Sequence, residues 1–452
     1  MLSHYNKEAI KVGLSVSLAL SIALWFGWDK PYWAVICVFI IAASESYNHA
    51  LRKGQNRLIG TLIGCAFAIL LISHLSQDHL LFLISYAGFL AFCVYFSSHK
   101  RYGYAFTIAA VVCAIIASIG GFESAKIFDI TVLRIQETIL GMLVYSAVFR
   151  IVWPQKTEDI FFDLLSTTFA QLRQNHALIL DYGTSAELTS VRSDLGKLSM
   201  TMDLPLNDSF RLRHEKRNWR LVIIAMQQLD YLQSLFIEDK LEDLSLLTTG
   251  QLRILESIES IKSKPQALSD WLMIDCLHYP LPKQSQSSFS ISNAKRLKNV
   301  AKALGILLTC FAIWIYLPLP GDFIFPMIAS IFASVLVTLP DNALKHAAVG
   351  CLLWGTLFLA QYVFVLPIFT ELWQLAGLYF LNAIIIWKVC EAPSMGIQKV
   401  LAGNLSVVLC MSALQITPSY NIEMPISMLM LVFVCLSVAS FYTKLFQDRK
   451  AF

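Results

Sequence analysis

Arg134 and Glu137 lie three positions apart inside a long apolar run of this 452-residue chain. Residues at this spacing share one face of a helix. Ionisable side chains within apolar segments cost free energy, and they usually face a cavity or each other. Two interpretations follow. Arg134 could hold a carboxylate while Glu137 exchanges a proton, or the two could form an internal ion pair that only orients the helix.

Arg57 opens another apolar run and is followed by Gly60 and Gly64. Small residues four positions apart allow two helices to approach closely. As a binding residue, Arg57 would attract an anion at the cytosolic entrance, and as an anchor it would hold the helix end at the membrane surface. Tyr104 follows two basic residues and admits the same two interpretations.

Trp33 stands at the start of a short apolar run and could stack on an aromatic substrate. Tryptophan also serves as an anchor at the membrane interface, which is the alternative interpretation. The sequence therefore nominates Trp33, Arg57, Tyr104 and Arg134 for substrate binding and Glu137 for proton coupling. Five residues are expected to serve helix packing or helix breaks: Gly60, Gly64, Gly141, Pro326 and Gly396.

The sequence lacks the signatures of several enzyme classes. It contains no GxxxxGK, GxSxG or HExxH motif, so we expect neither an enzyme nor ATP-driven transport within the chain. Nine of the ten cysteines lie in apolar runs and none has zinc-site spacing, so no metal and no cofactor is expected. The net charge of +4 is small, and no basic stripe points to nucleic acid.

The elements that must carry these residues are membrane helices. The chain is 56% hydrophobic and 15% charged, a composition typical of membrane proteins. A helix needs roughly 20 apolar residues to cross the bilayer. Such runs lie at about 9–28, 32–46, 57–75, 79–97, 103–121 and 131–152, and again at about 299–317, 323–339, 346–366, 371–387, 397–415 and 424–446. We therefore predict an all-α protein with about twelve transmembrane helices, the first run being a span rather than a cleavable leader.

The basic residues predict the orientation. Lysines and arginines gather at alternate ends of the runs, and such short loops resist translocation. Both chain termini and the long central segment are therefore expected in the cytosol.

The central segment has a different pattern. Apolar residues recur there at helical spacing, as in Phe161, Leu164, Leu165, Phe169 and Leu172. We predict a helical cytosolic domain that leaves through the Ser/Gln-rich stretch at 283–293. The predicted domains are a first transmembrane half at 1–153, the cytosolic domain at 154–296 and a second transmembrane half at 297–452.

The two halves look like parallel repeats. Each starts in the cytosol and makes an even number of crossings, so an axis along the membrane normal would relate them. We expect two six-helix bundles side by side with an anion held between them. The second run of each half is short or contains proline, and such interrupted segments at matching places point to a transporter's substrate site. Short, tilted helices are the simpler alternative.

Several motifs in order resemble one known family. They are Pro31-Tyr32-Trp33-Ala34-Val35, then Arg57 with Gly60, Thr61 and Gly64, then Arg134 and Glu137 with Gly141 and Trp153-Pro154. In the second half, Leu339-Pro340-Asp341-Asn342 and Ser394-Met395-Gly396 look similar as well. Together they resemble the fusaric acid resistance / aromatic acid exporter family.

The resemblance implies a bacterial inner-membrane secondary exporter of aromatic or related small organic acids, linked to the proton gradient. It also implies a periplasmic membrane-fusion adaptor as a partner, beside the acid itself and membrane lipid. A homo-oligomer of the chain is a separate partner to test, which the resemblance does not supply. Plant anion channels of the malate type are distant relatives, so a passive organic-anion channel is one alternative. A membrane scaffold or sensor that presents the cytosolic domain is another.

Overall fold

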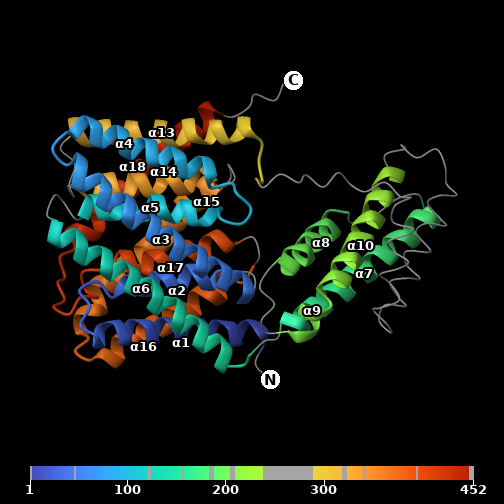
Figure 1. Cartoon of the computed structure of the whole chain (residues 1–452). Coiled ribbons are helices and arrows are strands. Elements are labelled where there is room, and N and C mark those ends of the chain that lie inside the picture. Colours follow the sequence, from blue (N-terminus) through green and yellow to red (C-terminus); the bar gives the residue numbers. More distant parts are fainter. Residues whose placement is uncertain are drawn as a thin grey trace. The chain divides into compact units, whose positions relative to one another are not determined.

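The computed structural model describes residues 3–44, 47–119, 124–154, 157–182, 188–203, 209–237, 289–317, 323–338, 343–392 and 395–446 (Figure 1). Apart from one isolated bridge between His99 and Phe289, the regular structure of these residues is helical. The predicted all-α class is therefore confirmed for this part of the chain. The chain divides into two compact units: Met1–Ser46, Ala50–Trp153 and Ser287–Phe452 form the first, and Tyr47–His49 and Pro154–Gln286 form the second.

Twelve α-helices of the first unit are described, and each overlaps one of the predicted apolar runs. They are α1 (His4–Trp25), α2 (Tyr32–Ala42), α3 (Tyr47–Leu75), α4 (His79–Phe96), α5 (Gly103–Ile119), α6 (Ser124–Ile151), α13 (Asn293–Tyr316), α14 (Ile324–Val335), α15 (Ala343–Phe364), α16 (Leu372–Val389), α17 (Gly396–Val408) and α18 (Glu423–Leu445). Short 3₁₀ turns follow two of them, at Leu336–Thr338 and Leu366–Ile368.

Seven of these helices are long and apolar enough to cross a membrane, namely α1, α3, α4, α13, α15, α16 and α18. Three others, α2, α5 and α14, are shorter apolar helices. Helix α6 has 28 residues but carries Arg134 and Glu137 within its length. The chain is a polytopic membrane protein, and the count of about twelve spans stays a prediction.

The second helix of each half is short. Helix α2 has 11 residues and α14 has 12, so each rises only about 16–18 Å against a hydrocarbon core of about 30 Å. Pro326 lies in the first turn of α14, where proline is tolerated, and the helix continues through it to Val335. Its predicted role in helix packing or a helix break stays a prediction. Gly396 opens α17, while the motif at 339–342 and Ser394 lie outside the described residues.

Helices of the two halves pack on each other. Helix α1 packs on α16 and α4 on α13, while α2 packs on α17 and α5 on α14. Figure 1 shows α4 with α13 at one edge of this unit and α1 with α16 at the opposite edge. Within the halves, α1 contacts α2 and α6 just as α13 contacts α14 and α18. The contacts repeat, as expected for duplicated halves.

Helix α2 lies at the interface of the two halves, and the prediction of two bundles side by side stays a prediction. Nine of the eleven residues of α2 are buried. A helix that is apolar on all sides needs neighbours on all sides. Helix α17 of the other half supplies one of them.

The first transmembrane half ends at a strained residue. Trp153 has a backbone φ of 44°, which is rare for a bulky side chain. Lys11, a buried residue of α1, donates a hydrogen bond from Nζ to the Trp153 carbonyl oxygen at 2.6 Å. This contact ties the end of α6 to the beginning of the chain.

The second unit contains α7 (Thr157–Tyr182), α8 (Leu188–Asp203), α9 (Phe210–His214) and α10 (Lys216–Ile237). Their apolar faces form one core, in which Phe161, Phe169 and Leu172 from α7 are buried beside Trp219 of α10. The helical spacing seen in the sequence is therefore the spacing of a packed face. The predicted domain limits and the cytosolic location stay predictions.

Candidate functional site

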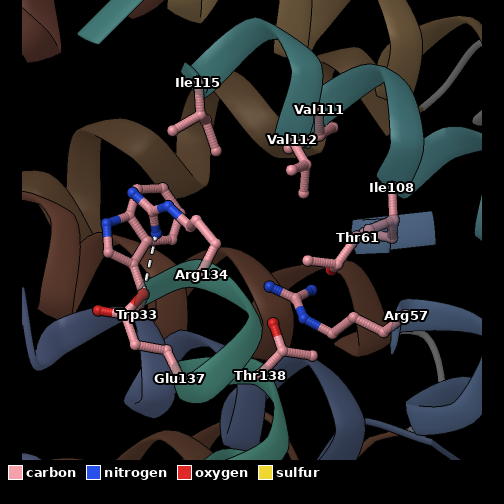
Figure 2. Close-up of a pocket in the computed structure, with 10 residues that line it drawn as sticks. All are labelled: Trp33, Arg57, Thr61, Ile108, Val111, Val112, Ile115, Arg134, Glu137 and Thr138. Carbon is pink, nitrogen blue, oxygen red and sulfur yellow. Dashed lines mark hydrogen bonds and ion pairs between the residues drawn. The ribbon is translucent and has the colours of Figure 1, made fainter. Parts of the chain in front are cut away.

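A pocket lies among four helices of the first unit, α2, α3, α5 and α6 (Figure 2). The empty space between its side chains amounts to about 360 Å³ when the open solvent at its mouth is included. Ten residues line it: Trp33, Arg57, Thr61, Ile108, Val111, Val112, Ile115, Arg134, Glu137 and Thr138.

Helical spacing places the polar side chains of the pocket. Arg57 and Thr61 are four positions apart on α3, and Arg134, Glu137 and Thr138 are three and four positions apart on α6. Each set therefore occupies one face of its helix. The two threonines were not predicted as site residues. Their signal was available in the sequence, because each follows a nominated arginine by one helical turn.

An apolar wall closes one side of the pocket. Helix α5 contributes it through a stripe at helical spacing, from Ile108 to Ile115. Helix α3 approaches α5 closely because Gly60 and Gly64 carry no side chain. A Cβ atom at Gly64 would lie 2.5 Å from the carbonyl oxygen of Ala109, and one at Gly60 would overlap the carbonyl group of Ala105. These glycines thus bring the charged face of α3 against the apolar wall.

Helix α6 is brought to α2 in the same way. A Cβ atom at Gly141 would lie 2.7 Å from the carbonyl oxygen of Ala34 and 2.8 Å from Cβ of Cys37. Gly141 is one turn beyond Glu137 on the same face of α6. This close approach places the side chains of α6 beside the Trp33 ring.

Arg134 is held between two partners. Its Cζ atom lies 3.7 Å from the centre of the Trp33 ring, a cation–π contact, and its Nη1 atom lies 3.4 Å from Oε2 of Glu137. Arg134 is 5% exposed and Glu137 is 1% exposed, so this ion pair is buried. Figure 2 shows these three side chains together on one side of the pocket.

Arg57 faces the same pocket without a counter-ion. Its side chain is 8% exposed, and its Nη1 atom donates a hydrogen bond to the hydroxyl oxygen of Tyr104 at 3.3 Å. Among the described residues, no carboxylate lies within ion-pair distance of it. A buried charge without a partner is unfavourable by several kcal/mol. An anionic ligand would supply Arg57 with the partner that the described residues do not.

The unpaired hydrogen-bonding atoms of the site also favour an anionic ligand. Within the described part of the chain, Trp33 Nε1, Arg57 Nε and Arg134 Nη2 are buried donors without a partner, and Glu137 Oε1 is a buried acceptor without one. Buried polar atoms are normally hydrogen-bonded. Donors outnumber acceptors and two guanidinium groups face one carboxylate, so the site suits a ligand with one negative charge. The described part of the chain offers no cluster of His, Cys, Asp or Glu for a metal ion.

The structure brings most of the nominated residues together. Trp33, Arg57, Arg134 and Glu137 all line the pocket, whereas Tyr104 stands behind Arg57 as its hydrogen-bond partner. All ten lining residues belong to the first half. This pocket therefore lies within the first half, where α2, α3 and α6 carry its polar groups. The expectation that an anion lies between the two halves stays a prediction. Helices α14 and α17, with Pro326 and Gly396, do not line it.

The sequence of the chain is similar to one known protein family and to several individual transporters. The sequence profile of the fusaric acid resistance protein family matches residues 8–273. The uncharacterized transporter YdhK of Escherichia coli (strain K12) is 26% identical over 229 residues, which cover 49% of this chain and 34% of that protein. The p-hydroxybenzoic acid efflux pump subunit AaeB of Salmonella heidelberg (strain SL476) is 26% identical over 214 residues, covering 44% of this chain and 32% of that protein. This chain thus spans about a third of the length of these relatives.

Proposed function

We propose that this chain, which belongs to the fusaric acid resistance protein family, is a secondary exporter of aromatic or related small organic acids in the bacterial inner membrane. One relative is named as an efflux pump subunit for p-hydroxybenzoic acid, and we propose the same class of substrate for this chain. The observation that carries the proposal is the charge of the pocket.

The pocket holds two buried guanidinium groups and one buried carboxylate. A monovalent anion would bring its net charge to zero. In a site of low dielectric constant this balance matters far more than it would in water. Arg57, which has no carboxylate partner among the described residues, is the natural ligand for the carboxylate of the acid.

The remaining walls suit an aromatic ring. Ile108, Val112 and Ile115 form an apolar surface, and the Trp33 ring lies across the pocket from them (Figure 2). The guanidinium group of Arg134 covers one face of that ring at 3.7 Å. We propose that the substrate ring packs against these apolar side chains while its carboxylate meets the guanidinium groups.

Glu137 is the proposed link to the proton gradient. Its only ion-pair partner among the described residues is Arg134, at 3.4 Å. A proton on Glu137 would raise the net charge of the pocket by one and would release Arg134 from its pairing. Anion occupancy and protonation of Glu137 would therefore be thermodynamically linked.

Proteoliposomes containing the full chain test this proposal. Efflux of radiolabelled p-hydroxybenzoate should depend on an imposed pH gradient in the wild type. Glu137→Gln should abolish that dependence while leaving exchange of labelled for unlabelled acid. Glu423→Gln is the matched control, because Glu423 is an exposed residue in the first turn of α18. Proton-dependent efflux that survives in Glu137→Gln would contradict the coupling role.

A passive organic-anion channel is the second candidate, and the excess of positive charge in the pocket favours it. A channel needs no titrating group, so Glu137→Gln would leave its conduction intact. Currents across a planar bilayer that reverse at the anion equilibrium potential would support the channel. Acid efflux from a chain that lacks the second unit would exclude a role limited to presenting that unit.

The surrounding organisation belongs to the same proposal. The distribution of lysine and arginine supports cytosolic chain termini, about twelve spans and a cytosolic helical domain at 154–296. The word "subunit" in the name of the relative supports a partner protein. We propose a periplasmic adaptor of the membrane-fusion type as that partner, with a homo-oligomer of this chain as a further possibility to test by mass measurement in detergent.

A further inference from the structure

Lys53 lies beside the pocket without being part of its lining. It stands one helical turn before Arg57 on α3, so the two side chains share a face and Lys53 is displaced by about 6 Å toward the start of the helix. In the proposed topology the start of α3 is its cytosolic end. Lys53 is therefore on the side from which a cytosolic acid would arrive.

Tyr104 joins the two cationic residues. The Nζ atom of Lys53 lies 5.5 Å from the centre of the Tyr104 ring, and the Tyr104 hydroxyl accepts the hydrogen bond from Arg57 at 3.3 Å. One tyrosine thus contacts an ammonium group with its ring and a guanidinium group with its hydroxyl. Among the described residues neither cation has a carboxylate partner.

This arrangement differs from that of an ordinary membrane anchor. An anchoring lysine extends its ammonium group into water, whereas Lys53 is half-buried and its ammonium group lies over an aromatic ring. Two like charges one turn apart on a helix repel each other. An anion between them would remove that repulsion.

We propose that Lys53 and Tyr104 form an entrance subsite for the carboxylate of an organic acid, from which the carboxylate passes to Arg57. The inference rests on the proposed function and adds a second binding position to it. The subsite would capture the acid by charge, and the Tyr104 ring would offer a surface on which an aromatic acid can stack. Lys53 would thus affect the capture of substrate rather than the rate of the loaded protein.

Transport of radiolabelled benzoate by the full chain in proteoliposomes of known orientation tests this inference. Lys53→Gln should raise the KM for benzoate presented on the cytosolic side roughly tenfold, as expected for a lost charge-assisted contact, and should leave the maximal rate unchanged. Lys53→Arg should restore the KM. The increase should shrink at high salt, because salt screens the attraction.

Arg52→Gln is the matched control. It removes the same charge from the same end of α3, but neighbouring residues on a helix do not share a face. If Lys53→Gln and Arg52→Gln change KM equally, Lys53 is only a topological anchor and the inference is overturned. Benzoate binding measured in detergent gives a second readout if a variant reconstitutes poorly, and an unchanged affinity in Lys53→Gln would also overturn it. Absence of acid transport by the wild type would instead refute the proposed function, and this inference with it.

Discussion

Replacement of Arg57 by methionine should stabilise the protein and weaken its binding of acid. Methionine has a similar volume to arginine, although it is shorter, and it carries no charge. In the described chain Arg57 is 8% exposed, donates a hydrogen bond to Tyr104 and has no carboxylate within ion-pair distance. The desolvation of this charge is therefore compensated only by weaker, more distant interactions such as that with Glu137.

The two effects can be estimated separately. Replacing buried ionic groups by apolar residues of similar volume often stabilises a protein by about 1–4 kcal/mol. The lost hydrogen bond to Tyr104 offsets about 1 kcal/mol of that gain. The missing contact with the substrate carboxylate should weaken binding by about 1.5–3 kcal/mol, which corresponds to roughly a 10- to 150-fold higher KM.

Arg134→Met provides the contrast. It would leave the Glu137 carboxylate, which is 1% exposed, without its ion-pair partner. Breaking a buried pair in this way should destabilise the protein by about 3–5 kcal/mol. Thermal melting of the purified variants in detergent should therefore shift upward for Arg57→Met and downward for Arg134→Met.

Benzoate transport in proteoliposomes completes the assay. If Arg57→Met lowers the melting temperature as much as Arg134→Met does, Arg57 is part of the structural framework. An unchanged KM in a well-folded Arg57→Met protein would refute the assignment of Arg57 as the anion ligand. Either result would remove the charge argument on which the proposed substrate class depends.

Gly60→Ala should destabilise the first unit by about 1–3 kcal/mol, because the added methyl group would overlap the carbonyl group of Ala105. Gly88→Ala, with nothing within 4 Å of the added carbon, should lower the melting temperature by no measurable amount. In the second unit, burial raises the pKa of Asp230 although Arg192 acts to lower it. The folded state thus binds this proton more tightly, so the associated stability is present at low pH and lost as the pH rises through the raised pKa. The resistance of α10 to proteolysis, measured across a series of pH values, should lose that dependence in Asp230→Asn. An unchanged pH profile in the variant would contradict the prediction.

The positions of the membrane helices could be predicted from hydropathy because lipid leaves the backbone few alternatives to a helix. The run at 79–97 corresponds to α4 (His79–Phe96), and the run at 103–121 to α5 (Gly103–Ile119). The end of α17 could not be predicted in this way. The run continues to 415, but the helix ends at Val408. Tyr362 of α15 hydrogen-bonds to the side chain of Ser412 and to the carbonyl oxygens of Ser419 and Asn421 beyond that end. The hydroxyl group of Tyr362, which is distant in sequence, thus satisfies hydrogen-bonding groups of this irregular segment.

The site shows a similar division between local and distant information. The spacing of Arg134 and Glu137 predicted a shared helix face, and the two side chains lie 3.4 Å apart in the structure. The stacking of Arg134 on Trp33 was not predictable, because it depends on the approach of α6 to α2 at Gly141. Spacing along one helix is readable in a sequence, whereas the distance between helices depends on the packing of the whole unit.

The repeated contacts of the two halves separate the framework from the chemistry. Helix α18 contacts α13 and α14 as α6 contacts α1 and α2. Yet the buried side chains of α18, which include Met428, Leu431 and Cys435, carry no charge, whereas α6 buries Arg134 and Glu137. The same helical framework therefore packs with or without buried charges. Burial of charge is unfavourable for stability, so the charged pair on α6 supports the proposal that the ligand binds beside this helix. The second half also buries one charged residue, Arg296, but at the first turn of α13 and not on α18.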